Sequence, residues 1–124
     1  TIHTPLTDET KGMVNADFFN KMKMGSSIYN TARGEIIVMN DLYHALKERR
    51  IKSAGLDVLE TEPIDYSHPL VKAWQCDESW ISGRLIITPH TAFYNKQSYE
   101  EMRKKAALEL KRIIEGEKPL YRVN

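Results

Sequence analysis

Short apolar runs and amphipathic segments alternate along most of this chain. The apolar runs at Ser27–Asn30, 53–58 and 85–88 have the length of strands in a buried sheet. Residues 15–22, and a segment that begins near Asn40, space their apolar positions as helices do. With a strand end at the first residues, we expect the order strand, helix, strand, helix, strand, long loop, strand and helix.

Capping residues delimit the first of these helices. Asn15 is a typical N-cap residue, and Gly25 is placed to end the segment. The second helix spaces its apolar side chains so that one face is buried, and these side chains are Leu42, Ala45 and Leu46. The pattern predicts two short helices that each cover a neighbouring layer.

The clearest helix lies near the end of the chain. Ser98 and Glu101 have the spacing of a capping box, and Gly116 and Pro119 stop the segment. Between them runs one apolar stripe at helical spacing, formed by Tyr99, Met102, Ala106, Leu110, Ile113 and Ile114. We expect a long amphipathic helix here.

The stretch 62–83 shows neither the helical spacing nor the short apolar runs of the rest of the chain. It holds Pro63, Pro69 and both tryptophans. Because proline interrupts helices and strands, we expect a surface loop with about one helical turn.

Strands that alternate with helices predict an α/β fold, with a parallel sheet covered by helices. In such a sheet the carboxyl ends of the strands line the ligand crevice. Arg33, Glu62 and His90 each follow a predicted strand. The sequence therefore predicts that these three side chains converge from distant positions.

The three side chains suit one kind of chemistry. Arg33 offers a planar fork that binds a carboxylate through two bonds, and Gly34 allows close backbone approach. A carboxylate at Glu62 beside His90 would orient the ring and favour imidazolium, the form a general acid needs. Taken singly, Arg33 and Glu62 also fit ordinary solvated loop positions, so the interpretation depends on their convergence.

Asp57 and the other histidines are less informative. Asp57 interrupts an apolar strand, and it either lies at an exposed strand end or holds a specific donor. His44 fits a helix face, His68 fits a loop, and His3 fits the lining of a crevice. None of them has a metal-ligand spacing, so no metal site is predicted.

Charge and cysteine content exclude several partner classes. A net charge of +1 with interspersed signs indicates neither nucleic acid nor a membrane surface as a partner. The lone Cys76 cannot form an intrachain disulfide, which fits a reducing compartment. No apolar run is long enough to span a bilayer. We expect a soluble, cytoplasmic protein.

Four segments carry a resemblance to a known family: HTPLTDETKGMVN, NTARGEII, AGLDVLETEP and TPHTAFY. Together they resemble the D-isomer-specific 2-hydroxyacid dehydrogenases over essentially the whole chain, in a D-lactate dehydrogenase-like or C-terminal-binding-protein-like branch. The resemblance implies half of a doubly wound, Rossmann-type sheet. Residues 1–94 would be the carboxyl-terminal half of an NAD(P)-binding domain, and the helix and tail at 95–124 would pack on a substrate domain.

The same resemblance implies a role for each residue of the site. Arg33 would bind the substrate carboxylate, His90 would be the acid/base, and Glu62 would pair with His90. NAD would exchange a hydride with a 2-oxo or D-2-hydroxy acid. The cofactor-lining residues would be Thr4, Pro5, Thr31, Ala32, Arg33, Asp57, His90, Thr91 and Ala92. Asp57 would face the carboxamide, and Phe93 would wall the substrate pocket beside Arg33.

Two features depart from the family pattern. No two glycines lie two positions apart, so the G-x-G-x-x-G turn that holds the pyrophosphate is absent, and we expect weak NAD binding by this chain alone. The gap between Glu62 and His90 is also enlarged, around Trp74 and Trp80. Since the chain opens like a strand end, we expect a piece of a longer protein, partnered by its own amino-terminal half and dimeric when intact.

Other interpretations stay open. Transcriptional co-repressors that resemble this family keep the trio and use NAD to control assembly. The chain also fits a proteolytic fragment that is inactive alone. The particular 2-hydroxy acid and the choice between NAD and NADP are not readable from these residues.

Overall fold

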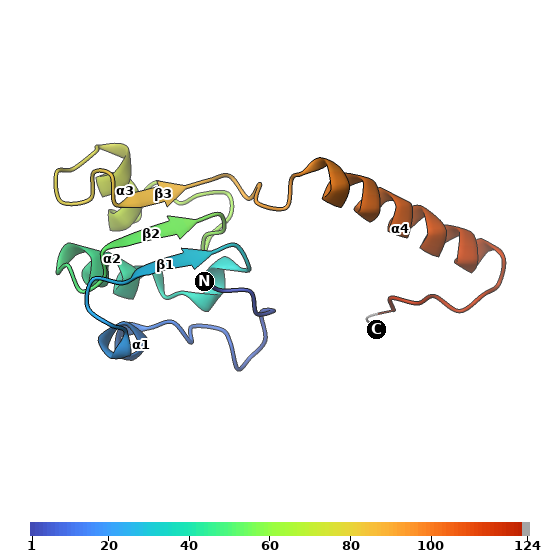
Figure 1. Cartoon of the computed structure of the whole chain (residues 1–124), viewed down its shortest axis with the longest axis horizontal. Coiled ribbons are helices and arrows are strands. Elements are labelled where there is room, and N and C mark those ends of the chain that lie inside the picture. The colour runs from blue at the N-terminus through green and yellow to red at the C-terminus, as the bar shows by residue number, and fades with distance from the viewer. Residues whose placement is uncertain (123–124) are drawn as a thin grey trace. The chain divides into compact units, whose positions relative to one another are not determined.

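The computed structural model describes residues 1–122 and holds two compact units (Figure 1). The first unit is Thr1–His90, and the second begins at Thr91. The family resemblance divides the chain at residue 94, and that division into a cofactor domain and a helix that packs on a substrate domain stays a prediction. Within residues 1–122, no helix is both long and apolar enough to cross a membrane.

Three parallel strands form the sheet of the first unit. They are β1 (Ser27–Asn30), β2 (Ser53–Leu56) and β3 (Leu85–Ile87), hydrogen-bonded in this order, and their arrows point the same way in Figure 1. Asn30 pairs with Leu56, and Leu56 with Ile87, so the three carboxyl ends lie at one edge. Ile2 adds a single parallel bridge to Asn30. The predicted parallel α/β sheet is confirmed.

The first two helices form where the sequence predicts them. They are α1 (Ala16–Lys21) and α2 (Met39–Lys47). Asn15 caps α1, because its side chain accepts the N–H of Phe18 at 3.1 Å. Leu42 and Leu46 of α2 are fully buried, as their spacing predicts.

The sheet buries one face and leaves the other open. On the buried face, Ile28, Leu56 and Leu85 join the same core as the apolar side of α2. On the other face, Tyr29 is 51% exposed and Ile86 is 66% exposed. Parallel sheets normally have both faces covered, so this one-sided burial agrees with half of a doubly wound sheet.

The stretch 62–83 contains more helix than the sequence predicts. The helix α3 (Pro69–Gln75) spans seven residues, about two turns. Pro69 occupies its first turn, where a missing N–H costs nothing, so the residue that suggested a loop begins a helix instead. His68 caps the helix, since its Nδ1 accepts the N–H of Leu70 at 3.2 Å. His68 thus lies in the loop, as the sequence predicts, and in addition caps α3.

Trp80 anchors the enlarged loop on α2. Its ring packs edge-on against Tyr43, with centroids 5.6 Å apart. Lys47 donates a hydrogen bond to the Tyr43 hydroxyl at 2.6 Å and lies 5.9 Å from the Trp80 ring centroid. The loop is thus fixed to the fold by an aromatic and cationic contact.

The second unit contains the long helix α4 (Lys96–Ile114). Its N-cap is Asn95, whose side chain accepts the N–H of Ser98 at 2.9 Å. Ser98 lies inside the helix, so the predicted capping box of Ser98 and Glu101 is wrong, and Glu101 instead accepts a bond from Gln97. None of the described side chains of α4 is buried.

Candidate active site

Hydrogen bonds tie the carboxyl ends of the three strands into one row. The Asn30 carbonyl accepts the N–H of Asp57 at 2.9 Å, and the Asp57 carbonyl accepts the N–H of His90 at 2.9 Å. Arg33 follows Asn30 by three residues, and Glu62 follows Asp57 by five. This row is the physical reason why residues distant in sequence meet at one edge of the sheet.

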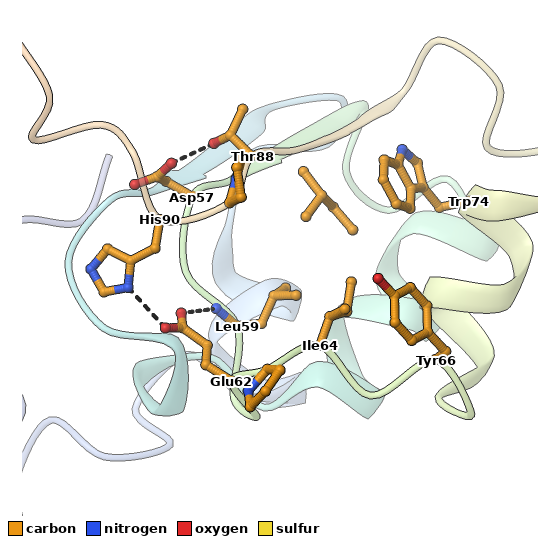
Figure 2. Close-up of a pocket in the computed structure, with 11 residues that line it drawn as sticks. Asp57, Leu59, Glu62, Ile64, Tyr66, Trp74, Thr88 and His90 are labelled. Carbon is orange, nitrogen blue, oxygen red and sulfur yellow. Dashed lines mark hydrogen bonds and ion pairs between the residues drawn. The ribbon is translucent and has the colours of Figure 1, made fainter.

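Glu62 and His90 form the best-defined contact of the site (Figure 2). His90 Nδ1 lies 2.8 Å from Glu62 Oε2, and Glu62 Oε1 accepts the N–H of Leu59 at 3.1 Å. The hydrogen bond from His90 holds the pKa of Glu62 below its usual value, with the Leu59 N–H adding to it and partial burial opposing it. Glu62 therefore stays ionised at neutral pH and fixes the orientation of the ring.

The backbone at His90 is held in an uncommon conformation. Its φ of 54° lies in the left-handed region, which costs a non-glycine residue about 1–2 kcal/mol. Backbone strain of this kind gathers at functional sites. The turn that follows β3 thus presents the imidazole at the end of the sheet.

Arg33 follows β1 and is exposed. Its Nη1 donates to the Ala32 carbonyl at 2.7 Å, and the chain then turns through the short 3-10 helix Gly34–Ile36. At Gly34 the backbone of Leu59 comes so close that a Cβ would lie 1.9 Å from its carbonyl oxygen. The close approach predicted at Gly34 is therefore to the protein's own backbone.

The three predicted catalytic residues share one hollow of about 250 Å³. It is lined by Arg33, Gly34, Glu35, Val58, Leu59, Glu60, Glu62 and His90. An arginine and a histidine thus border the same small space. The predicted convergence is confirmed, whereas the chemical role of each residue stays a prediction.

Asp57 resolves an alternative that the sequence leaves open. It is 6% exposed, and its carboxylate accepts a hydrogen bond from the Thr88 hydroxyl. It therefore holds a specific donor rather than lying at an exposed strand end. Thr88 lies 31 residues further along the chain, and the sequence analysis did not single it out.

A second hollow, of about 540 Å³, gathers residues predicted to line the nicotinamide. It is lined by His3, Thr4, Pro5, Leu6, Thr31, Ala32 and Arg33. Arg33 borders both hollows. His3, expected to line a crevice, does so.

Comparison with known proteins identifies the family. Residues 1–92 match the model of the D-isomer specific 2-hydroxyacid dehydrogenase, NAD binding domain. This chain belongs to that family. Over 115 residues it is 39% identical to a hydroxypyruvate reductase of Blautia hydrogenotrophica, and this alignment covers 93% of this chain and 33% of that protein. Over 124 residues it is 36% identical to a glyoxylate reductase of Thermofilum pendens, covering 100% of this chain and 34% of that protein.

A solved structure agrees with this assignment to the 2-hydroxyacid dehydrogenases. D-lactate dehydrogenase of Lactobacillus jensenii with NAD⁺ superposes with a TM-score of 0.77 at 29% identity, covering 98% of this chain and 38% of that chain. The chain thus spans about a third of the length of the curated relatives it matches. The expected Rossmann-type fold and an NAD-binding domain are confirmed.

Three residues expected at the dehydrogenase site lie beyond the first unit. Thr91, Ala92 and Phe93 belong to the unit that begins at Thr91. Their assigned roles stay predictions from the family resemblance. Within its own unit, the Phe93 ring packs edge-on against Tyr94, with centroids 6.2 Å apart.

Proposed function

We propose that this chain is the carboxyl-terminal part of the NAD-binding domain of an oxidoreductase that interconverts a 2-oxo acid and a D-2-hydroxy acid. The native polypeptide would supply the remainder of the cofactor site and a substrate domain. The observation that carries this function is the hollow shared by Arg33, Glu62 and His90. Because similar proteins are named hydroxypyruvate and glyoxylate reductases, a short-chain 2-oxo acid is the proposed substrate.

Arg33 would bind the carboxylate of that substrate. A guanidinium fork forms two parallel hydrogen bonds with a carboxylate and so fixes the direction of the rest of the molecule. The carbonyl next to the carboxylate would then lie toward His90, across the same hollow. Such orientation would supply a large part of the rate enhancement, because the reacting groups are already held in the geometry of the reaction.

His90 would move the proton. Glu62 accepts from Nδ1, so Nε2 is the ring atom that delivers a proton to the carbonyl oxygen during reduction. In the oxidative direction the same nitrogen takes the proton from the hydroxyl. The Glu62 carboxylate favours the charged ring and keeps its edge pointed at the substrate.

The residues at the strand ends fit the nicotinamide end of the cofactor. Thr4, Pro5, Thr31 and Ala32 line the second hollow with small side chains, and the buried Asp57 carboxylate can accept an amide N–H. When bound, the nicotinamide supplies or receives the hydride. Arg33 borders both hollows, which would bring the substrate against the nicotinamide face.

The test is a turnover assay on the native polypeptide that carries these residues, with NADH and glyoxylate, hydroxypyruvate or pyruvate. Replacing His90 by glutamine should lower turnover by roughly a hundredfold to ten-thousandfold, the usual contribution of a positioned general acid. His44→Gln is the matched control, because His44 lies exposed on α2 and pairs only loosely with Glu48 at 3.8 Å. That variant should keep full turnover.

Two outcomes would contradict the proposed function. Unchanged turnover in His90→Gln would remove His90 from the chemistry. Tight NADH binding without turnover of any 2-oxo acid would favour the co-repressor interpretation instead.

A further inference from the structure

Asn30 is the one uncharged polar residue among the buried core positions of the described chain, and both polar atoms of its side chain are hydrogen-bonded. It is 0% exposed. Its Oδ1 accepts the N–H of Ala32 at 3.0 Å, and its Nδ2 donates to the carbonyl of Arg33 at 2.9 Å. A single buried amide therefore fixes the backbone on both sides of the peptide that joins Ala32 to Arg33.

The contacts around Arg33 leave the Asn30 amide as the main hydrogen-bond partner of the Arg33 carbonyl. The Arg33 carbonyl also accepts the N–H of Ile36, but at a longer 3.4 Å. The guanidinium itself is exposed and donates back to the Ala32 carbonyl. Because Arg33 is exposed and its guanidinium bonds the backbone of its own turn, the position of the side chain depends on where that backbone is placed.

We propose that Asn30 is a positioning residue, whose buried amide sets the turn that aims Arg33 at the substrate carboxylate. This inference rests on the proposed function, because it assumes that Arg33 binds that carboxylate. Asn30 also links this turn to the rest of the site, since its carbonyl accepts the N–H of Asp57 in the row that continues to His90. Its amide thus keeps Arg33 in register with the imidazole.

Asn30→Ser in the native polypeptide tests the proposal. A serine hydroxyl can still accept the Ala32 N–H, as in a Ser/Thr turn, but it is too short to reach the Arg33 carbonyl. We expect the KM for the 2-oxo acid to rise about tenfold or more with folding intact, since small misplacements of a binding group cost one to two orders of magnitude. Asn30→Asp, which keeps the size and the acceptor and replaces the donor, should act in the same direction.

A double-mutant cycle with Arg33→Ala separates positioning from general destabilisation. If Asn30 acts through Arg33, the double variant should have nearly the KM of Arg33→Ala alone. Asn15→Ala is the control, because it removes another asparagine that bonds a backbone N–H, on α1, which lines neither hollow. It should lower thermal stability and leave the KM unchanged.

The outcomes distinguish two failures. An unchanged KM in both Asn30 variants, or effects of Asn30→Ser and Arg33→Ala that simply add, would overturn the positioning role while leaving the proposed function in place. An unchanged KM in Arg33→Ala alone would overturn the proposed function, and the role of Asn30 with it.

Discussion

Arg33 and Glu62 would act on the proposed reaction in different ways, Arg33 by its geometry and Glu62 by its charge. Arg33 offers two donors in a fixed plane, and its value depends on direction. Glu62 contributes an ionised carboxylate 2.8 Å from His90 Nδ1, and its value depends on its charge. Substitutions that keep one property and remove the other can therefore tell the two roles apart.

Glu62→Gln should shift the pH profile of reduction to lower pH. The hydrogen bond from His90 lowers the pKa of Glu62, and by linkage the ionised carboxylate favours the protonated ring. A neutral amide places no negative charge opposite Nδ1 and so removes this preference for the protonated ring. The measurement is kcat/KM for the 2-oxo acid across pH 5 to about 9, a range that brackets the usual titration of histidine.

The same linkage sets the acid limit of this contact. Because the pKa of Glu62 is lower in the folded chain than its ordinary value of about 4.3, its stabilising contribution is fully present above that value. The contribution is lost only as the pH falls through the lowered pKa. Both side chains of the pair are more than a third exposed, so this contribution is small and falls further with added salt.

Arg33→Lys should leave the pH profile in place and reduce both affinity and rate. A lysine keeps the positive charge but loses the two-pronged contact, so the loss in kcat/KM should reach about tenfold to a hundredfold. Steady-state kinetics of Arg33→Lys and Glu62→Gln across pH show which of the two residues sets the pH profile. A moved profile in Arg33→Lys with an unmoved one in Glu62→Gln would mean that the two roles are assigned the wrong way round.

The charged residues of the candidate site were predictable from the sequence. The residues whose hydrogen bonds fix the backbone and the carboxylate around them were not. Arg33 and His90 follow strands in a parallel pattern, so the fold rule alone brings them to one edge. The Asn30 side chain acts through two hydrogen bonds within its own turn, and Thr88 acts through one that spans 31 residues. An asparagine that ends a strand before a turn is a known turn signal, and it was the only available clue to Asn30.

At the scale of elements, the crossing of two loops fixes the site more tightly than any helix does. The turn after β1 passes the segment after β2 at Gly34, with room for no side chain. Each of these loops carries one member of the trio, Arg33 on the first and Glu62 on the second. Their separation is therefore set by backbone contact, which is stiffer than contact between flexible side chains.

Gly34→Ala should therefore be strongly destabilising. The added Cβ would lie 1.9 Å from the Leu59 carbonyl oxygen, and backbone must move to admit it, at a cost of about 3 kcal/mol or more. Gly55→Ala is the matched control, since its Cβ would meet only the ring of Tyr29, at 2.8 Å, and that ring is half exposed and can turn away. Thermal unfolding of the two variants should differ clearly, and equal midpoints would contradict the close crossing.

The start of α4 offers a test between sequence and structure. Asn95→Ala should destabilise the first turn of the helix by about 1 kcal/mol, the usual cost of losing an N-cap side chain. Ser98→Ala should have little effect, although Ser98 is the cap that the sequence predicts. The amide hydrogen exchange rates of residues 96–99 report the stability of this turn in both variants. Faster exchange in Ser98→Ala but not in Asn95→Ala would support the predicted capping box instead.

Both element-level errors of the sequence analysis have the same physical origin. In each case the N-cap residue, His68 or Asn95, comes one to three positions before a residue that is more familiar as a signal, Pro69 or Ser98. Pro69 reads as an interruption from sequence, yet it suits a first helical turn when a cap precedes it. The helix α2 was predicted because packing and propensity agree there, since its periodic apolar side chains are buried, whereas α4 was predicted from its periodicity alone, since none of its described side chains is buried.

At the scale of the whole molecule, the proposed function gives this chain one end of the cofactor site. The second hollow, where we propose that the nicotinamide binds, is formed by residues near the ends of strands, whereas the glycine-rich turn that would receive the pyrophosphate is absent from the sequence. The sheet also leaves one face open, with Tyr29 and Ile86 exposed on it. Both features follow from a chain that spans about a third of the length of its relatives.

This chain alone should therefore bind NADH weakly and not catalyse the reduction. Most dinucleotide affinity comes from phosphates on a helix N-terminus and from close backbone approach at glycines, whereas the contacts proposed for this chain are to the nicotinamide end. It follows that reduced nicotinamide mononucleotide and NADH should bind with nearly equal affinity, both weaker than micromolar. Calorimetric titration with the two ligands measures this, with the native polypeptide as the control in which NADH should bind far more tightly. Micromolar binding of NADH by the 124 residues, at least tenfold tighter than the mononucleotide, would instead reveal a phosphate or adenosine site within this chain.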